Sequence, residues 1–126
     1  MRYDADKAPD PEIWLELDES ERIDLVRAYH LRSREPVGQN AKVHATAHAI
    51  VENQIALGDV TVVPATINRL MLEGLDRHDA IHAVASILMG IFFDVMTKKD
   101  DGGDINTKYG RELATLTAAS WRAQKD

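Results

Sequence analysis

The chain has 126 residues, the length of a single domain, and its 44% hydrophobic and 29% charged residues are ordinary for a folded protein in water. A formal net charge of -6 and a pI near 5.3 argue against a general nucleic-acid-binding surface. The chain has no cysteine, which excludes a disulfide framework, thiolate catalysis and thiolate metal sites.

Residues 1–11 are polar and therefore do not resemble the apolar core of a signal peptide. The longest apolar run, from Ala83 to Phe93, contains Ser86 and Gly90 and is shorter than a bilayer span. From these two features we expect a cytoplasmic protein without a membrane partner.

Residues 1–9 are charged and show no apolar periodicity, so we expect a flexible N-terminus ahead of a single helical-bundle domain over residues 10–126. Asp10 and Pro11 are the residue types that favour the N-cap and the first position of a helix. They predict a short first helix whose Trp14 packs as part of a lid on the main body.

A second helix is predicted over residues 19–33, because Asp18 and Glu21 have the spacing of a capping box at its start. Val26 and His30 fall on the apolar side of this helix. We interpret His30 as a histidine at the helix end, near the negative end of the helix dipole, rather than as a metal ligand.

A third helix is predicted to begin near Gln39 or Asn40 and to end at Gly58, a residue type that favours the C-terminal cap. At about 100° of rotation per residue, His44 and His48 lie inside its apolar stripe and Glu52 lies at the margin of that stripe. The apolar members of the stripe are Val43, Ala47, Val51 and Ile55.

After a short extended stretch at Val60–Val63, a fourth helix is predicted to begin at Pro64. Its expected buried residues are Ile67, Leu70, Met71 and Leu75. Asp76 then caps a long and very apolar helix over residues 77–97. The second histidine pair, His78 and His82, lies on one side of it together with Ala85, Met89, Phe92 and Met96.

A polar loop over residues 98–104 leads to a final helix that Asn106 or Thr107 would cap. This order of elements predicts an all-α, single-domain bundle of about five or six helices. The residues expected to be mostly buried are Ile50, Val51, Ile55, Leu70, Ile81, Leu88 and Phe92.

The two histidine pairs carry a resemblance to a known family. The pattern Asn40…His44-x3-His48-x5-Gln54, followed by His78-x3-His82-Ala83-Val84, is similar to a family of small bacterial all-helical proteins of unknown function. The similarity covers roughly residues 40–97. It implies a helical fold and a site at the histidine pairs, and it implies no established activity.

The chain also departs from that family. The family's acid lies next to the glutamine, where this chain has Asn53, and Glu52 lies one place earlier. Acids follow the second histidine pair in the family, where this chain has Ser86 and Gly90. If those acids are ligands in the family, an inherited metal site would have lost them here.

Residues four apart in a helix lie on the same side, so each histidine pair can converge on one point. If the two histidine faces pack together, the metal ligands would be His44, His48, Glu52, His78 and His82. Ligation rich in nitrogen suits a divalent transition metal such as zinc, copper, nickel or iron. The sequence thus indicates a metal-binding protein, with Glu52 as a ligand or as the base of a metal-dependent hydrolase.

The alternative is a metal-free network in which the buried rings hydrogen-bond one another and nearby polar groups. The protein would then be a non-catalytic module for interaction or dimerisation. We expect a homodimer in either case, because the helix over residues 77–97 is apolar nearly all round. No nucleophile-elbow, phosphate-loop or dinucleotide-binding motif is present, so the pattern leaves open whether the protein is an enzyme.

Overall fold

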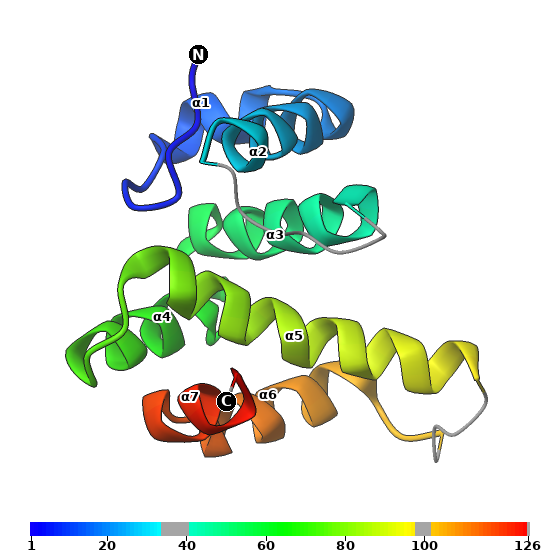
Figure 1. Ribbon diagram of the computed structural model, residues 1–126. Coiled ribbons are helices and arrows are strands. Elements are labelled where there is room, and N and C mark those ends of the chain that lie inside the picture. Colours follow the sequence, from blue (N-terminus) through cyan, green and yellow to red (C-terminus); the bar gives the residue numbers. More distant parts are fainter. Residues whose placement is uncertain (34–40, 98–101, 126) are drawn as a thin grey trace.

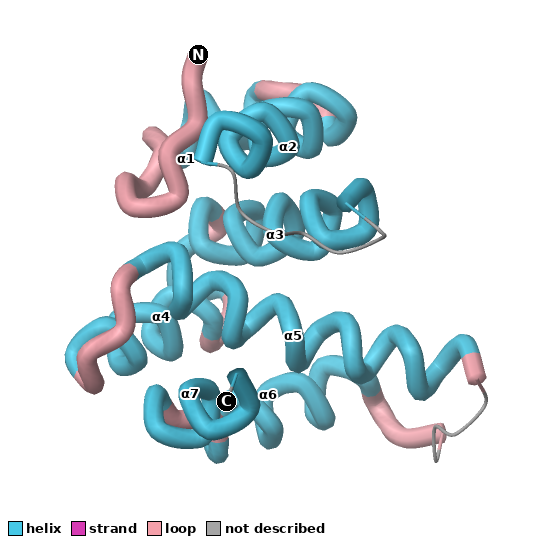
Figure 2. The backbone as a smooth tube through the Cα atoms, in the orientation of Figure 1, coloured by secondary structure: helices cyan, strands magenta, loops and turns pink. Residues whose placement is uncertain are grey.

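The computed structural model describes residues 1–33, 41–97 and 102–125. All regular structure in these residues is helical, which confirms the predicted all-α bundle (Figures 1 and 2). The elements are α1 (Pro11–Glu16), α2 (Glu19–Ser33), α3 (Ala41–Ala56), the 3-10 turn η1 (Gly58–Val60), α4 (Val63–Leu72), α5 (Arg77–Met96), α6 (Ile105–Thr115) and α7 (Ala118–Lys125).

The helices are stacked in layers. Figure 1 shows α1 and α2 at one side, then α3, then α4 and α5, and finally α6 and α7 near the C-terminus. α3 packs against α1, α2, α4 and α5, and α5 also packs against α6. The two helices that carry the histidine pairs, α3 and α5, are therefore neighbours in the middle of the stack.

Aspartates begin several of the helices, because a carboxylate there accepts backbone N–H groups that have no partner within the helix. Asp10 accepts from Ile13 N at 3.1 Å, and Asp76 accepts from Asp79 N at 2.7 Å. The predicted capping box is also confirmed: Glu21 N donates to Asp18 at 2.9 Å, and Asp18 N donates to Glu21 at 3.3 Å.

Several predicted boundaries are wrong. Where an extended stretch was expected at Val60–Val63, Val60 belongs to η1, Val63 begins α4, and between them Thr61 alone has extended dihedrals (φ -121°, ψ 168°). Gly58, the first residue of η1, is left-handed with φ of +73°. Asp104, rather than Asn106 or Thr107, caps α6 by accepting from Thr107 N at 3.0 Å. The start predicted for the third helix at Gln39 or Asn40 lies outside the described residues.

The predicted final helix is divided into α6 and α7, which brings the described α-helices to seven. Leu116 has extended dihedrals (φ -69°, ψ 132°) and interrupts the helix. Thr117 and Ser120 then form a new cap, in which each backbone N–H donates to the other's hydroxyl at 3.0 Å. The side chains of Thr117 and Ser120 thus offer the backbone an alternative to a continuous helix.

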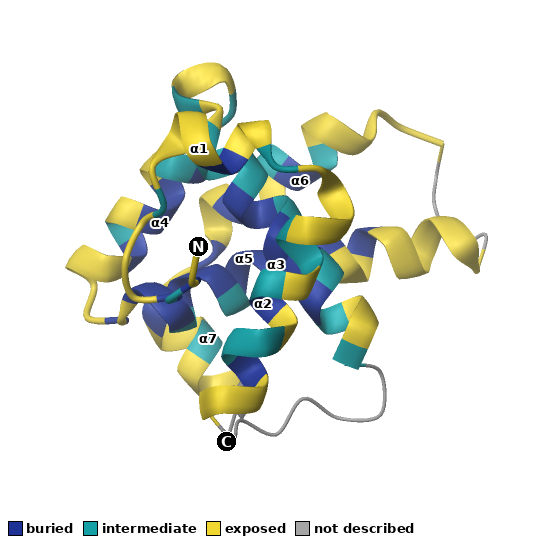
Figure 3. Ribbon diagram, turned by 90° about the horizontal axis from the view of Figure 1, so that it is seen from above, coloured by how far each residue is buried: buried dark blue, intermediate teal, exposed yellow. Residues whose placement is uncertain are grey.

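Two groups of buried residues fill the interior, and α3 contributes to both. The N-terminal core consists of Tyr3, Ala5, Trp14, Val26, Ala45 and Ala49. The main core combines residues of α3, α4, α5 and α6, among them Val51, Leu70, Ile81, Leu88 and Leu113. Figure 3 shows dark blue, buried segments on α3 and α5 near the centre of the molecule.

The expectation that residues 1–9 are loosely attached is wrong for Tyr3 and Ala5, which are 1% and 0% exposed. Their burial was not visible as periodicity, because this segment forms no helix. Instead it crosses the bundle, held by hydrogen bonds described below.

The core prediction is confirmed for Val51, Leu70, Ile81 and Leu88, whereas Ile50 and Ile55 are only partly buried. Met71 and Phe92 are 41% and 43% exposed, so the prediction of their burial is wrong. Met71 shares the outer side of α4 with the exposed Leu72. Phe92 belongs to the C-terminal half of α5, which reaches past the other helices (Figure 1).

By length and composition, α5 is apolar enough to cross a membrane, which the interrupted apolar run of the sequence did not indicate. Its first half is nevertheless built into the bundle. Arg77, His78, Ala80, Ile81 and Val84 are all buried there against the other helices. This packing is that of a central core helix.

Candidate metal centre

All five histidines of the chain meet in one cluster, which we call the histidine cluster: His30 of α2, His44 and His48 of α3, and His78 and His82 of α5. The ring centroids are 4.2 Å apart for His78 and His82 and 4.7 Å apart for His44 and His82. The predicted convergence of the two histidine pairs is therefore confirmed. His30 lies in the last turn of α2, as predicted, and its ring centroid is 4.8 Å from that of His44, so it joins a cluster that the sequence did not predict for it.

A backbone carbonyl sets the protonation of the His30 ring. His30 Nδ1 lies 2.8 Å from the carbonyl oxygen of Val26, one turn earlier in α2. A carbonyl can only accept a hydrogen bond, so Nδ1 carries the proton and donates it. In the neutral ring this leaves a bare electron pair on Nε2, which faces His44 and His82. A histidine that binds metal is commonly oriented in this way by a partner on its other nitrogen.

Three ring nitrogens form a compact triangle. The Nε2 atom of His44 lies 3.2 Å from that of His30 and 3.2 Å from that of His82, and the third side measures 3.5 Å. In a tetrahedral zinc site, bonds of about 2.0–2.1 Å place the ligand nitrogens about 3.3–3.4 Å apart. The triangle therefore has the dimensions of one face of such a site.

A second, overlapping group contains His30, His48, His78 and His82. One ligand atom from each of these rings lies within 4.8 Å of the others, and three of the four residues are buried. His30 and His82 belong to both groups. The histidine cluster thus offers more nitrogens than the four of a tetrahedral site, and they come from three helices.

Glu52 lies beside the histidine cluster with its carboxylate already bound. Arg77 donates from Nη1 to Oε2 and from Nη2 to Oε1, both at 2.7 Å, and the Tyr3 hydroxyl donates to Oε2. The Glu52 side chain is 1% exposed. Both oxygens of Glu52 thus hold the buried guanidinium. The role of Glu52 as a metal ligand or base stays a prediction.

The same contacts determine the tautomer of His48. Tyr3 has one hydroxyl proton, and it goes to the carboxylate of Glu52, which can only accept. His48 Nε2 lies 2.8 Å from that hydroxyl and must therefore be the donor between them. The other nitrogen, His48 Nδ1, is buried and has no hydrogen-bond partner among the residues that the structure describes. A bare nitrogen in a buried position is what a metal ion requires of a histidine.

Burial and neighbouring histidines favour the neutral form of three imidazole rings in the histidine cluster. Burial lowers the pKa of His30, His44 and His48, most strongly for His48, and the neighbouring histidines lower it further for His44 and His48. Burial, followed by the charge of Glu52, raises the pKa of Tyr3 well above its usual value. At neutral pH His30, His44 and His48 therefore favour the neutral imidazole, the form that binds metals.

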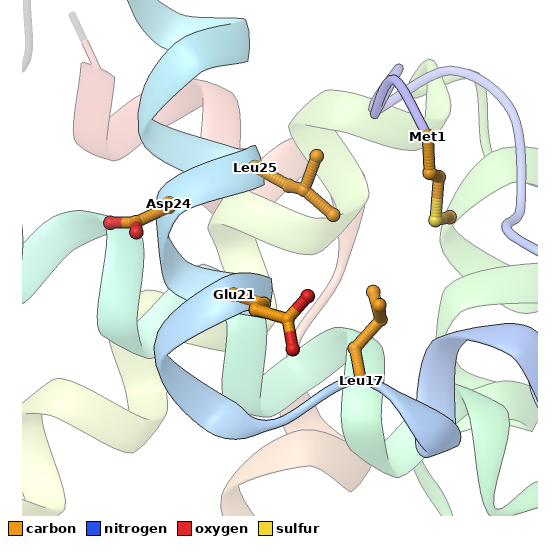
Figure 4. Close-up of a pocket in the computed structure, with 5 residues that line it drawn as sticks. All are labelled: Met1, Leu17, Glu21, Asp24 and Leu25. Carbon is orange, nitrogen blue, oxygen red and sulfur yellow. The ribbon is translucent and has the colours of Figure 1, made fainter.

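A separate pocket lies between the N-terminus and α2, lined by Met1, Leu17, Glu21, Asp24 and Leu25 (Figure 4). It has a volume of about 340 Å³. Figure 4 shows Asp24 pointing away from the other side chains. The pocket is lined by no histidine, and in Figure 4 only the Glu21 carboxylate faces its apolar residues, so the pocket by itself offers no set of metal ligands.

No family model, curated protein or solved structure matches the chain. The resemblance to small bacterial helical proteins therefore stays a prediction. The fold and the site by themselves define an all-α bundle with a buried histidine cluster that could hold a metal ion.

Sequence reasoning missed three residues of this region: Tyr3, His30 and Arg77. A signal existed for His30, since it follows Val26 by four residues on the apolar side of α2. No comparable signal existed for Tyr3 and Arg77. Tyr3 lies outside any helix, and Arg77 meets Glu52 only through the packing of α5 on α3.

Proposed function

We propose that this protein binds a divalent transition metal ion, zinc foremost, through the histidine cluster. The observation that supports the proposal best is the triangle of Nε2 atoms from His30, His44 and His82, with sides of 3.2, 3.2 and 3.5 Å. These spacings match the nitrogen–nitrogen edges of tetrahedral zinc ligation. A fourth nitrogen from His48 or His78 would complete an all-histidine site.

The imidazole nitrogens of the histidine cluster restrict which metal ions can bind there. Neutral imidazoles are ligands of intermediate softness, which suit zinc, copper, nickel and iron better than magnesium or calcium. His44 and His82 are only partly buried, so an ion can reach the triangle from their side. The other three rings are buried and fixed by packing, which prepares the site before the ion arrives.

The geometry supports metal binding better than metal-dependent hydrolysis. A hydrolytic zinc site keeps one position open for water and uses a nearby base. The carboxylate nearest in the chain to the third-helix pair is Glu52, and its oxygens are bound to Arg77 and Tyr3. We therefore assign the cluster to holding an ion.

The experiment is elemental analysis of protein purified without a histidine tag, loaded with zinc and dialysed. We expect about one zinc per chain in the wild type, and much less in a His30→Gln, His82→Gln double variant, which removes two corners of the triangle. Circular dichroism would check that the variant keeps its helices. Wild-type protein that retains no zinc, copper, nickel or iron would overturn the proposal.

The alternative of a metal-free histidine network makes a different prediction. In that case His44 Nε2 would donate its proton to His30 or His82, and the network would be complete without an ion. A chelator would then leave the melting temperature unchanged. In the metal-bound case a chelator lowers it, because an ion that binds only the folded state stabilises that state.

A second proposal concerns self-association and comes from a groove between α3 and α5. The groove has a volume of about 600 Å³ and is lined almost entirely by apolar residues: Val43, Thr46, Ala47, Ile50, Met89, Phe92, Phe93, Val95 and Met96, with Lys42 at one edge. Phe93 and Met96 are 58% and 79% exposed. Monomeric proteins seldom expose contiguous apolar surface of this kind.

We propose that a second copy of this chain covers the groove. The C-terminal half of α5 supplies one wall of the groove, and on that wall the side chains of Phe93 and Met96 are largely exposed. One surface thus contains both the recess and the projecting side chains, as a twofold-symmetric contact requires. We expect a dimer in sedimentation velocity, and a monomer for Phe93→Asp. A wild type that stays monomeric at high micromolar concentration would overturn this proposal.

A further inference from the structure

The N-terminal segment is tied to all three helices of the histidine cluster. The backbone oxygen of Tyr3 accepts from Arg32 of α2 at 2.8 Å, and that of Ala5 accepts from Arg77 of α5 at 2.9 Å. Asp6 accepts from the backbone N–H of His78 at 3.4 Å. The Tyr3 side chain reaches Glu52 and His48 of α3. Residues 3–6 therefore form a strap over the buried side of the site.

Within this strap, the Tyr3 hydroxyl is the only group hydrogen-bonded to the imidazole ring of His48 in the described part of the chain. Its own proton is committed to Glu52, and Arg77 holds Glu52 in place through two further bonds. The hydroxyl oxygen can therefore act toward His48 only as an acceptor. An acceptor at Nε2 favours the tautomer with its proton on Nε2 and an electron pair on Nδ1.

We propose that Tyr3 is a positioning residue of the metal centre: its hydroxyl holds His48 in the tautomer and orientation that leave Nδ1 available to the ion. This inference rests on the proposed metal binding and extends it to the N-terminal segment. Glu52 acts one step further out, by fixing the direction of the tyrosine hydroxyl. Such outer partners of a ligating histidine commonly change metal affinity without touching the ion.

The test is Tyr3→Phe, which removes the acceptor and keeps the ring that packs between Trp14 and Tyr29. The matched control is Tyr109→Phe. Tyr109 is also buried and also donates one hydrogen bond, to Gln54 Oε1 at 2.8 Å, but it lies in the main core outside the histidine cluster. Both variants lose a buried hydroxyl, so a general effect on folding appears in both.

Zinc affinity is measured by competition with a chromophoric chelator. We expect Tyr3→Phe to bind zinc about 10- to 100-fold more weakly than wild type, the range found for partners of this kind. Tyr109→Phe should bind like wild type. Equal zinc affinity of Tyr3→Phe and wild type would overturn the proposal.

A spectroscopic measurement separates this inference from the proposed function. Long-range proton–nitrogen NMR spectra of the metal-free wild type report which nitrogen of His48 carries the proton. We expect the proton on Nε2 in wild type and a mixture of tautomers in Tyr3→Phe. If wild type binds no zinc, the metal proposal fails, while this spectrum still tests what Tyr3 does. A proton on Nδ1 in wild type would refute the role of Tyr3 even if zinc binds, and even if Tyr3→Phe does not fold.

Discussion

Two buried polar groups lie side by side in this bundle, and they differ in how completely their hydrogen bonds are satisfied. In the group of Glu52, Arg77 and Tyr3, the donors meet acceptors: the carboxylate receives three hydrogen bonds, and its charge is balanced by the guanidinium. In the histidine cluster, by contrast, the buried Nδ1 of His48 meets no hydrogen-bond donor among the residues that the structure describes. The first group is complete in its hydrogen bonds, whereas the second is incomplete, because one buried nitrogen has no donor.

Comparison of His48 with Glu52 shows that the degree of burial does not distinguish a polar residue with satisfied hydrogen bonds from one that is available to a ligand. His48 and Glu52 are equally buried, at 0% and 1% exposure, and lie one turn apart on α3. The carboxylate has been neutralised from within the chain, so its role is structural. Burial lowers the pKa of His30, His44 and His48, and neighbouring histidines lower it further for the last two, so these three rings favour the neutral form that our proposal requires.

The largest effect is expected from breaking the complete group. Arg77→Met would leave the Glu52 charge buried without its partner, and loss of one member of a buried pair typically costs about 3–5 kcal/mol. Urea unfolding in the presence of chelator measures this cost. The control is Arg69→Met, since Arg69 pairs with Glu73 at the surface and such pairs contribute about 0–1 kcal/mol. If both variants lose the same stability, Glu52 and Arg77 do not form the fixed pair described here.

A smaller effect is expected when the metal is supplied to or withheld from the incomplete group. Zinc at about 100 times its dissociation constant should raise the free energy of unfolding by about 2.7 kcal/mol. His48→Ala should abolish this response, and without metal it should cost about 1–3 kcal/mol because Tyr3 loses its partner. Thermal melts with zinc and with chelator measure both. A His48→Ala variant that still responds fully to zinc would contradict the assignment.

The effect of pH on the metal-free protein should be the gentlest of the three. The folded-state pKa values of His30, His44 and His48 lie below the usual value of about 6.5, so the unfolded chain binds more protons as the pH falls. The contribution of these three histidines to the free energy of unfolding is then fully present above about pH 6.5, and it is lost as the pH falls toward the lowered pKa values.

The pH dependence of the stability is measured by comparing the urea concentrations at half-unfolding at pH 7.5 and at pH 5.5, both in the presence of chelator. His48→Gln should flatten it, because His48 has the most strongly lowered pKa. A wild type that is more stable at pH 5.5 would contradict the assignment of neutral rings.

The sequence was informative wherever the determinants were local. The spacing of His44 with His48 and of His78 with His82, together with the apolar stripe on each helix, was enough to predict their convergence. Caps at Asp10, Asp18 and Asp76 likewise depend on the next three residues. Helix type and helix start can be predicted in this way because the interacting groups lie within one turn.

The remaining features depend on contacts between distant residues. Glu52 and Arg77 are 25 residues apart, and Tyr3 and Glu52 are 49 apart, so neither contact leaves a periodic trace. The pairing of Glu52 with Arg77 and Tyr3 therefore could not be predicted from its place beside His48. Phe92 was expected to be buried because its helix is apolar, but it lines the open groove between α3 and α5 and is 43% exposed.

If His30 and His82 bind one ion, their separation along the chain has a consequence for the rate of unfolding. His30 and His82 are 52 residues apart, and their Nε2 atoms lie 3.5 Å from each other in the fold. A bound ion would join α2, α3 and α5 as a reversible cross-link, and at least one of its bonds must break before these helices separate. If the site forms only after the folding transition state, zinc should slow unfolding and leave the folding rate nearly unchanged. The lifetime of the folded state would then follow the supply of metal.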